Sequence, residues 1–326
     1  MATSDDLSKD TIALVQKLYG VSLTGAWPIL QGDYSQVFQA SDDKGATYVV
    51  KIHPEFSEPS ALVIKYLQSI NFKWMPKQYI SKDGNVWERC DEGYVSIQDF
   101  IESPTSLVWD SAVDDDCYRQ MGAALHDLHE LDIPEDLASK LPKETYIPRF
   151  LNEWRQVEGK IASGNDSIAV KLQKITAEHA AKIAEIIDRS IALGKELEPE
   201  GRKLGLVHGD FHLGNVIKPE SGQIYVVDWD FPSISLPEND MAIFINPARA
   251  AKVAAGYDEP GFPEPRAHVY YSLGKILRGL AAFGGRAVNT NLTDTKREQS
   301  VTTFHGMLLD NSDADNSLNF ARSLDS

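Results

Sequence analysis

Residues 207–217 read VHGDFHLGNVI, and residues 224–230 read IYVVDWD. Among the apolar residues of these two runs stand three carboxylates and one amide, namely Asp210, Asp228, Asp230 and Asn215. Such groups are costly to bury without partners, so we expect them at the mouth of a cleft. The connecting residues 219–222 read PESG, which is typical of a turn. The sequence therefore predicts a hairpin that returns Asn215 to the side of Asp228.

The polar cluster contains oxygen ligands that suit a hard divalent cation. Asn215, Asp228 and Asp230 are the candidate ligands, and Mg²⁺ is the usual ion where phosphates complete the coordination. Asp210 precedes Asn215 by five residues. That is the spacing of a catalytic loop in which the Asp accepts a hydroxyl proton and the Asn holds the metal. The pattern thus indicates phosphoryl transfer, with Asp210 as the catalytic base.

Two details of the cluster carry a resemblance to a known family. Gly209 stands between His208 and Asp210, where protein kinases have Arg. Residues 228–230 read Asp-Trp-Asp, where protein kinases have Asp-Phe-Gly. The stretch resembles the aminoglycoside phosphotransferase and choline kinase-like family of small-molecule kinases. The spacing around residues 228–230, with Pro232, Pro237 and Asp240 following, is similar to that of the branch that includes spectinomycin phosphotransferase.

The resemblance implies an α+β, protein-kinase-like bilobal fold, with a small antiparallel-sheet N-lobe and a larger, mainly helical C-lobe. It implies an enzyme that uses ATP and Mg²⁺ to phosphorylate a hydroxyl of a small molecule. Aminoglycosides, aminocyclitols, amino alcohols and sugar-like molecules are the candidate acceptors. His208 is grouped with Asp210 as catalytic, although its place in a turn after a strand favours bracing of the loop.

Two other interpretations remain open. A catalytically weak, kinase-like protein would bind nucleotide and act through partners; its support is a glycine-poor phosphate loop and an uncertain helix glutamate. A protein kinase is disfavoured by the missing Arg before Asp210 and the missing Gly after Trp229. It is also disfavoured because no activation segment is recognisable.

Upstream, residues 46–50 form a β-prone run that ends at Lys51. The resemblance implies that this lysine contacts the nucleotide phosphates and pairs with an acidic residue of the following helix. Glu58, near the start of that helix, is the candidate partner, and Glu55 is the second candidate. A solvated lysine on a strand edge and a merely capping glutamate are the alternatives.

Two further segments are candidates for contact with the nucleotide. Residues 32–35 read GDYS between two β-prone runs. Ser35 would lie over the phosphates unless the segment is an ordinary hairpin. The strand that carries Gln98 and Phe100 breaks at Ser103, where a hinge belongs. Backbone groups around Gln98 and Phe100 are therefore the expected partners of an adenine ring.

The chain of 326 residues is longer than one hydrophobic core usually serves, so two lobes are expected. We place a nucleotide-binding lobe at residues 1–102 and a catalytic and substrate lobe at residues 103–326, in which residues 135–203 form a helical insertion. In the family that the chain resembles, helices at this place contribute to the acceptor site. His126 and His129 are expected to be satisfied core histidines rather than catalytic ones.

The net charge of −16 argues against nucleic acid and anionic membranes as partners, because phosphate backbones are bound by basic surfaces. It favours a cationic acceptor, although the acidity alone would also serve solubility. Two cysteines are too few for a disulfide framework, and no apolar run approaches the ~20 residues of a membrane span. The sequence therefore predicts a cytoplasmic protein and leaves its oligomeric state open.

Overall fold

The computed structural model describes residues 7–31, 35–103, 107, 113–220 and 222–325. These residues form two compact units, each built from separated segments of the chain. The first unit comprises Met1–Gln120, Asp132–Pro142 and His208–Ser233, and the second comprises Met121–Leu131, Lys143–Val207 and Ile234–Ser326. The lobe boundary expected after residue 102 stays a prediction. Residues 32–34 of the expected phosphate loop lie outside the described residues.

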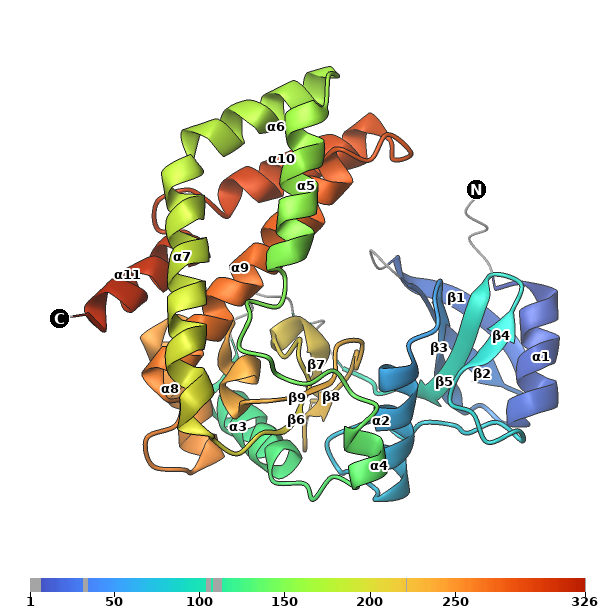
Figure 1. Ribbon diagram of the computed structural model, residues 1–326. Coiled ribbons are helices and arrows are strands. Elements are labelled where there is room, and N and C mark those ends of the chain that lie inside the picture. Colours follow the sequence, from blue (N-terminus) through green and yellow to red (C-terminus); the bar gives the residue numbers. More distant parts are fainter. Residues whose placement is uncertain (1–6, 32–34, 104–106, 108–112, 221, 326) are drawn as a thin grey trace. The chain divides into compact units, whose positions relative to one another are not determined.

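The first unit contains a five-stranded antiparallel sheet with the strand order β1-β2-β3-β5-β4 (Figure 1). Its strands are β1 (Leu23–Gln31), β2 (Gln36–Asp42), β3 (Thr47–His53), β4 (Glu88–Cys90) and β5 (Gly93–Asp99). Helix α1 (Lys9–Tyr19) packs on this sheet, where its Val15 joins Phe38 and Val50 in one apolar core. The predicted fold class, an N-terminal antiparallel sheet followed by a mainly helical remainder, is confirmed.

Lys51 lies inside β3, two residues before the strand ends at His53. It faces Val37 of β2 and Ser96 of β5, so both sides of its backbone are paired. The prediction that the strand ends at Lys51 is therefore wrong, because Ile52 and His53 continue the pairing with β5. The alternative of a lysine on a sheet edge is wrong for the same reason.

The predicted hairpin after Asn215 is present in the first unit. A 3₁₀ turn η2 (Leu213–Asn215) leads into β7 (Val216–Ile217), which pairs antiparallel with β8 (Tyr225–Val226). The backbone N–H of Val227 then donates to the carbonyl of Asn215 at 2.9 Å. Asn215 is thereby fixed next to the strand end that carries Asp228. Helix α2 (Glu58–Ser69) belongs to the same unit.

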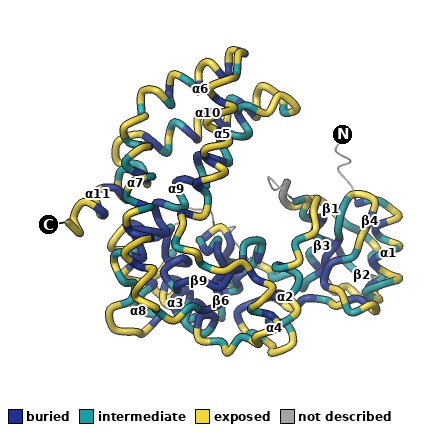
Figure 2. Tube along the Cα trace, in the orientation of Figure 1, coloured by how far each residue is buried: buried dark blue, intermediate teal, exposed yellow. Residues whose placement is uncertain are grey.

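The second unit is a helical assembly around α9, against which α5, α7 and α10 pack (Figure 1). Its helices are α5 (Leu151–Ser163), α6 (Ser167–Glu178), α7 (Ala180–Leu197), α8 (Pro247–Tyr257), α9 (Pro265–Ala287), α10 (Asp294–Gly306) and α11 (Asp313–Ser323). Exposed residues follow the outer sides of α6 and α7, and buried ones gather toward α9 (Figure 2). Helices α5, α6 and α7 lie within residues 135–203, the range expected to form a helical insertion, and the insertion itself stays a prediction.

The remaining elements are short, apart from α3 (Asp115–His129). They are α4 (Glu135–Ala138), η1 (Glu198–Glu200), β6 (Gly205–Val207), β9 (Ser233–Ser235) and η3 (Pro237–Met241). The expected core role of His129 is confirmed: it is buried, with Nε2 3.0 Å from Asp240 Oδ2 and Nδ1 3.2 Å from the Tyr257 hydroxyl. The same expectation is wrong for His126, because 44% of its side chain is exposed. Among the described residues, no helix combines the length and apolar character that crossing a bilayer requires.

His268 of α9 gives the second unit a predictable sensitivity to acid. Burial lowers the pKa of its imidazole to about 4, against the opposing effect of its hydrogen bond to the Met241 carbonyl at 2.9 Å. In the unfolded chain the imidazole becomes protonated as the pH falls through its ordinary pKa of 6.5, whereas in the folded chain it becomes protonated only near pH 4. The free energy of unfolding should therefore fall by about 2 kcal/mol between pH 7 and pH 5 through this group alone.

Urea unfolding at both pH values measures the effect. The variant His268→Gln keeps a donor for Met241 but cannot titrate, so its loss between pH 7 and pH 5 should be smaller than that of the parent. Equal losses in the two proteins would assign the acid sensitivity to other groups.

Candidate active site

The loop that carries Asp210 depends on a glycine. Gly209 has a φ of 77°, and a Cβ atom at this position would lie 2.0 Å from the carbonyl oxygen of Phe231. Only glycine fits both the left-handed backbone and this close approach. The residue that separates the chain from protein kinases in sequence is therefore required by the path of its own backbone.

His208 braces this loop through both ring nitrogens. The backbone N–H of Asp210 points at Nδ1 at 3.3 Å, so that nitrogen is the acceptor. Nε2 then carries the proton and donates to the Val227 carbonyl at 3.0 Å. The side chain is fully buried. These contacts support the bracing interpretation of His208, because the one proton of its neutral ring is already donated to the Val227 carbonyl.

Asn215 is held with a defined orientation of its amide. Its Nδ2 donates to the backbone carbonyl of Asp210 at 2.9 Å, which ties the two ends of the loop together. The amide oxygen is then the side-chain atom that remains for a cation. Asn215 is buried and lines the cavity described below.

Lys51 joins the two aspartates of the strand end. Its Nζ forms an ion pair with Asp228 Oδ1 and lies 3.7 Å from Asp230 Oδ2. Burial raises the pKa of Asp228, but the adjacent ammonium outweighs it, and the pKa lies below its usual range. For Asp230, burial raises the pKa to about 6, with Asp228 adding to the rise and Lys51 opposing it. The site thus keeps one strongly ionised carboxylate beside one that holds its proton more firmly.

The expected pairing of Lys51 with Glu58 is wrong: among the described residues, Lys51 pairs with other carboxylates. The described partners of Lys51 are Asp228 and Asp230. Glu58 is the first residue of α2, next to the cap Ser57, and is exposed. It is also the only acidic residue in α2, whose inner positions are apolar or small. With no carboxylate deeper in that helix, the lysine pairs with the acids of the strand end instead.

A cavity of about 720 Å³ in the first unit brings most of the predicted residues together. This volume lies within the range of sites that hold small ligands. The predicted residues that line it are Ser35, Lys51, Gln98, Phe100, Asn215, Asp228 and Asp230. Asp210 does not line the cavity. Its Oδ2 lies 4.0 Å from Nε2 of His212, and His212 does line the cavity. Glu58 and His208 do not line the cavity.

Several lining residues were not predicted from the sequence. His53 stacks on Trp87 with ring centroids 3.8 Å apart, and its Nε2 lies 3.0 Å from Ser96 Oγ. Burial, followed by the charge of Lys51, lowers the pKa of His53 to about 3, so this ring is neutral. The signal in the sequence was the alternation of β3, which places His53 on the same face as Lys51. His212 gave no comparable signal.

The donor set of the cavity fits a magnesium ion. Asn215, Asp228 and Asp230 offer an amide oxygen and two carboxylates, the hard ligands that Mg²⁺ prefers. Asp228 presents its carboxylate from a left-handed backbone with a φ of 68°, a conformation that aspartate tolerates better than most residues. A sheet lysine, a braced Gly-Asp loop and an oxygen donor set together define the class of kinase-like phosphotransferases.

Comparison with known proteins agrees with this class. The model of the phosphotransferase enzyme family matches residues 27–268. The chain belongs to this family, and it is a phosphotransferase of the small-molecule kinase class. No curated protein sequence gives a significant match.

Solved structures show where the fold recurs. A crystal structure of spectinomycin phosphotransferase with ADP and spectinomycin has 22% sequence identity and a TM-score of 0.82, covering 96% of this chain and 98% of that one. An aminoglycoside phosphotransferase from Alicyclobacillus acidocaldarius has 12% identity and a TM-score of 0.65, covering 99% and 97%. Plasmodium vivax ethanolamine kinase has 14% identity and a TM-score of 0.61, covering 88% and 82%. The chain therefore has the fold of these kinases.

Proposed function

We propose that the protein transfers the γ-phosphoryl group of ATP to a hydroxyl of a small molecule, with Mg²⁺ as the cation. The observation that carries the proposal is the convergence of Lys51, Asn215, Asp228 and Asp230 on one cavity of the first unit. Mg²⁺ supplies charge neutralisation at the phosphates, and the proposal assigns it to the oxygen donors of Asn215, Asp228 and Asp230. The cytoplasm, where ATP is plentiful, is the proposed place of action.

The residues of the chain have separate roles in this proposal. Lys51 attracts and orients the phosphates of the nucleotide from the middle of the sheet. Asp210 orients the acceptor hydroxyl and accepts its proton as the oxygen attacks phosphorus. His208 holds the loop so that Asp210 and Asn215 keep their spacing. The roles of positioning and of proton transfer thus fall on different side chains.

The cavity also offers apolar contacts for an aromatic base. Its lining includes Val37 and Val49 from the sheet and Ile217 from β7. Gln98 and Phe100 line the same cavity near the end of β5, as the hinge interpretation requires. We assign the adenine ring to these apolar side chains, with backbone groups near Phe100 as its hydrogen-bonding partners.

The acceptor is proposed from the relatives and from charge. The similar structures include kinases of spectinomycin and ethanolamine, which both carry amino groups. A net charge of −16 attracts such cations to the protein. We therefore propose an amino-bearing alcohol, such as an aminocyclitol or an amino alcohol, as the acceptor.

An ATP-consumption screen tests the proposed function. Purified protein with Mg²⁺ is given panels of aminocyclitols, aminoglycosides, amino alcohols and neutral sugars, and ADP release is measured. The Asp210→Asn variant run in parallel removes signals that come from contaminating kinases. Acceptor-dependent turnover confined to the parent supports the proposal. ATP binding with no turnover on any panel would favour the catalytically weak, partner-dependent alternative.

Lys51→Ala tests the phosphate role of the lysine. A charge-assisted hydrogen bond contributes roughly 1.5–3 kcal/mol, so kcat/KM for ATP should fall by about 10- to 100-fold. Acceptor affinity measured without nucleotide should be unchanged. Lys44→Ala, on an exposed turn between β2 and β3, is the matched control and should behave like the parent. An unchanged kcat/KM for ATP in Lys51→Ala would remove the lysine from the site.

A further inference from the structure

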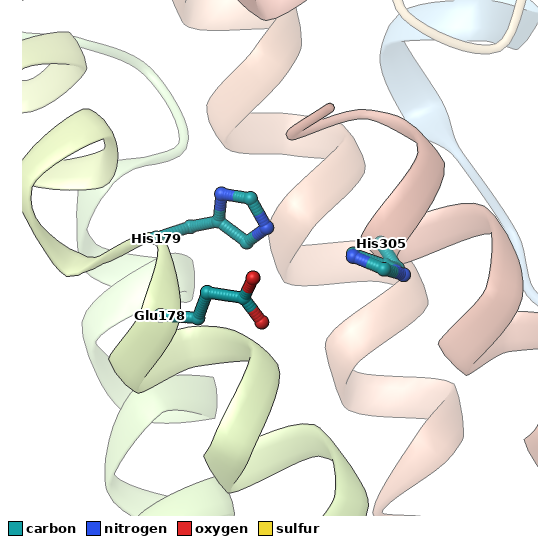
Figure 3. Close-up of side chains that lie close together, drawn as sticks. All are labelled: Glu178, His179 and His305. Carbon is teal, nitrogen blue, oxygen red and sulfur yellow. The ribbon is translucent and has the colours of Figure 1, made fainter. Parts of the chain in front are cut away.

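Three side chains with metal-binding atoms meet in the second unit, and none of them is among the residues that line the nucleotide cavity. Glu178 is the last residue of α6, and His179 is the single residue between α6 and α7. His305 lies in the last turn of α10. Figure 3 shows Glu178 and His179 extending from the α6–α7 corner toward His305 on the neighbouring helix.

The distances among these side chains are short. One ligand atom from each residue lies within 4.8 Å of the other two, and the imidazole rings have centroids 5.6 Å apart. The Nε2 atom of His179 is buried and has no hydrogen-bond partner among the described residues. A buried polar atom without a partner costs free energy, so a group that satisfies it would stabilise this corner.

We propose that Glu178, His179 and His305 bind one divalent transition-metal ion of the zinc class. Two imidazoles and one carboxylate are a ligand set that suits Zn²⁺ rather than Mg²⁺, which takes oxygen ligands. With metal–ligand bonds of roughly 2.0–2.2 Å, tetrahedral ligands stand about 3.4 Å apart. The ligand atoms therefore have to move closer together by about 1 Å, which rotation of the side chains allows, and water completes the coordination.

The surroundings of the triad are compatible with a cation. Lys182, one turn further along α7, is a neighbouring positive charge, and its Nζ is held by the Leu308 carbonyl at 2.9 Å and by Asp310 at 3.4 Å.

A metal at this place would join the α6–α7 corner to the end of α10. These helices are linked in the described structure by packing and by ion pairs such as Lys171–Glu298 at 2.7 Å. An ion that binds the folded chain and not the unfolded one raises the unfolding temperature as its concentration rises. The expected consequence is a zinc-dependent gain in stability that is independent of nucleotide.

The test is a titration of the full, untagged chain with Co²⁺ in excess Mg²⁺, which saturates oxygen-ligand sites. Co²⁺ gains visible absorption in a site of low coordination number, and competition by Zn²⁺ removes that absorption. The parent should bind one equivalent. His305→Ala should weaken binding by at least about tenfold, since even loss of a group that only supports a ligand costs 10- to 100-fold. His126→Gln, which removes a half-exposed histidine elsewhere, is the control and should bind like the parent.

A second variant and a second readout keep the test independent of folding. Glu178→Gln changes an exposed side chain, so it should leave the fold intact and still weaken the binding of Co²⁺. Added Zn²⁺ should raise the unfolding temperature of the parent and of His126→Gln, but not of His305→Ala. Equal Co²⁺ affinity in the parent, Glu178→Gln and His305→Ala would overturn the proposal, as would a parent that binds no equivalent at all.

Discussion

Replacing Asp210 by asparagine should lower kcat by about 10²–10⁴-fold, the usual contribution of a positioned acid–base group, while MgATP affinity changes little. Asparagine keeps the shape of the side chain but removes the charge that orients the acceptor hydroxyl and the base that accepts its proton. The loop should survive the change, because it is held by the backbone of Asp210. Its N–H contacts His208 and its carbonyl accepts from Asn215.

The measurement is pre-steady-state turnover with the true acceptor, so that chemistry limits the rate. Asp43→Asn, on the exposed turn between β2 and β3, makes the same chemical change outside the site and serves as the control. An Asp210→Asn variant that keeps more than about a tenth of the parental kcat would show that the proton leaves by another route.

Replacing Asp228 by alanine should remove metal-dependent ATP binding and turnover together, because it takes away a metal ligand and the ion-pair partner of Lys51. The fold should persist, since Lys51 still has Asp230 nearby. The left-handed backbone at this position is a complication, as alanine there costs roughly 1–2 kcal/mol. Asp228→Asn tolerates that backbone and removes only the charge, so the two variants together separate strain from electrostatics.

Calorimetric titration with ATP, with and without Mg²⁺, measures the binding, and circular dichroism checks the fold. The contrast with Asp210→Asn is diagnostic, since only the Asp228 variants should lose nucleotide binding. If either folded Asp228 variant binds MgATP as tightly as the parent, the assignment of this carboxylate to the metal is wrong.

The local sequence pattern predicted the hairpin and the closeness of Asn215 to Asp228, because two runs of β-branched residues joined by a short turn pair as a hairpin. The partner of Lys51 could not be found in this way. Its carboxylate comes from a residue 177 positions away, and the nearer Glu58 matched a general kinase pattern that this helix does not follow. Pairing over such distances depends on how separate segments fold together, which periodicity does not encode.

The histidines also show that local pattern identifies the role of a residue only where the residue belongs to such a pattern. His129 was correctly interpreted as a core residue, since it lies among apolar residues at helical spacing. His212 carries no pattern of its own, and its closeness to Asp210 follows only from the path of the loop. A lone polar residue in a loop is thus recognised once its neighbours in space are known.

The close approach at Gly209 also limits the routes by which such loops diversify. An arginine at this position would bring a Cβ atom to within 2.0 Å of the Phe231 carbonyl, so no choice of rotamer relieves the clash. A Gly-Asp loop and an Arg-Asp loop are therefore alternative backbones, and a single codon change at residue 209 does not lead from one to the other. Variation around this active site has to enter through the segments that surround the loop.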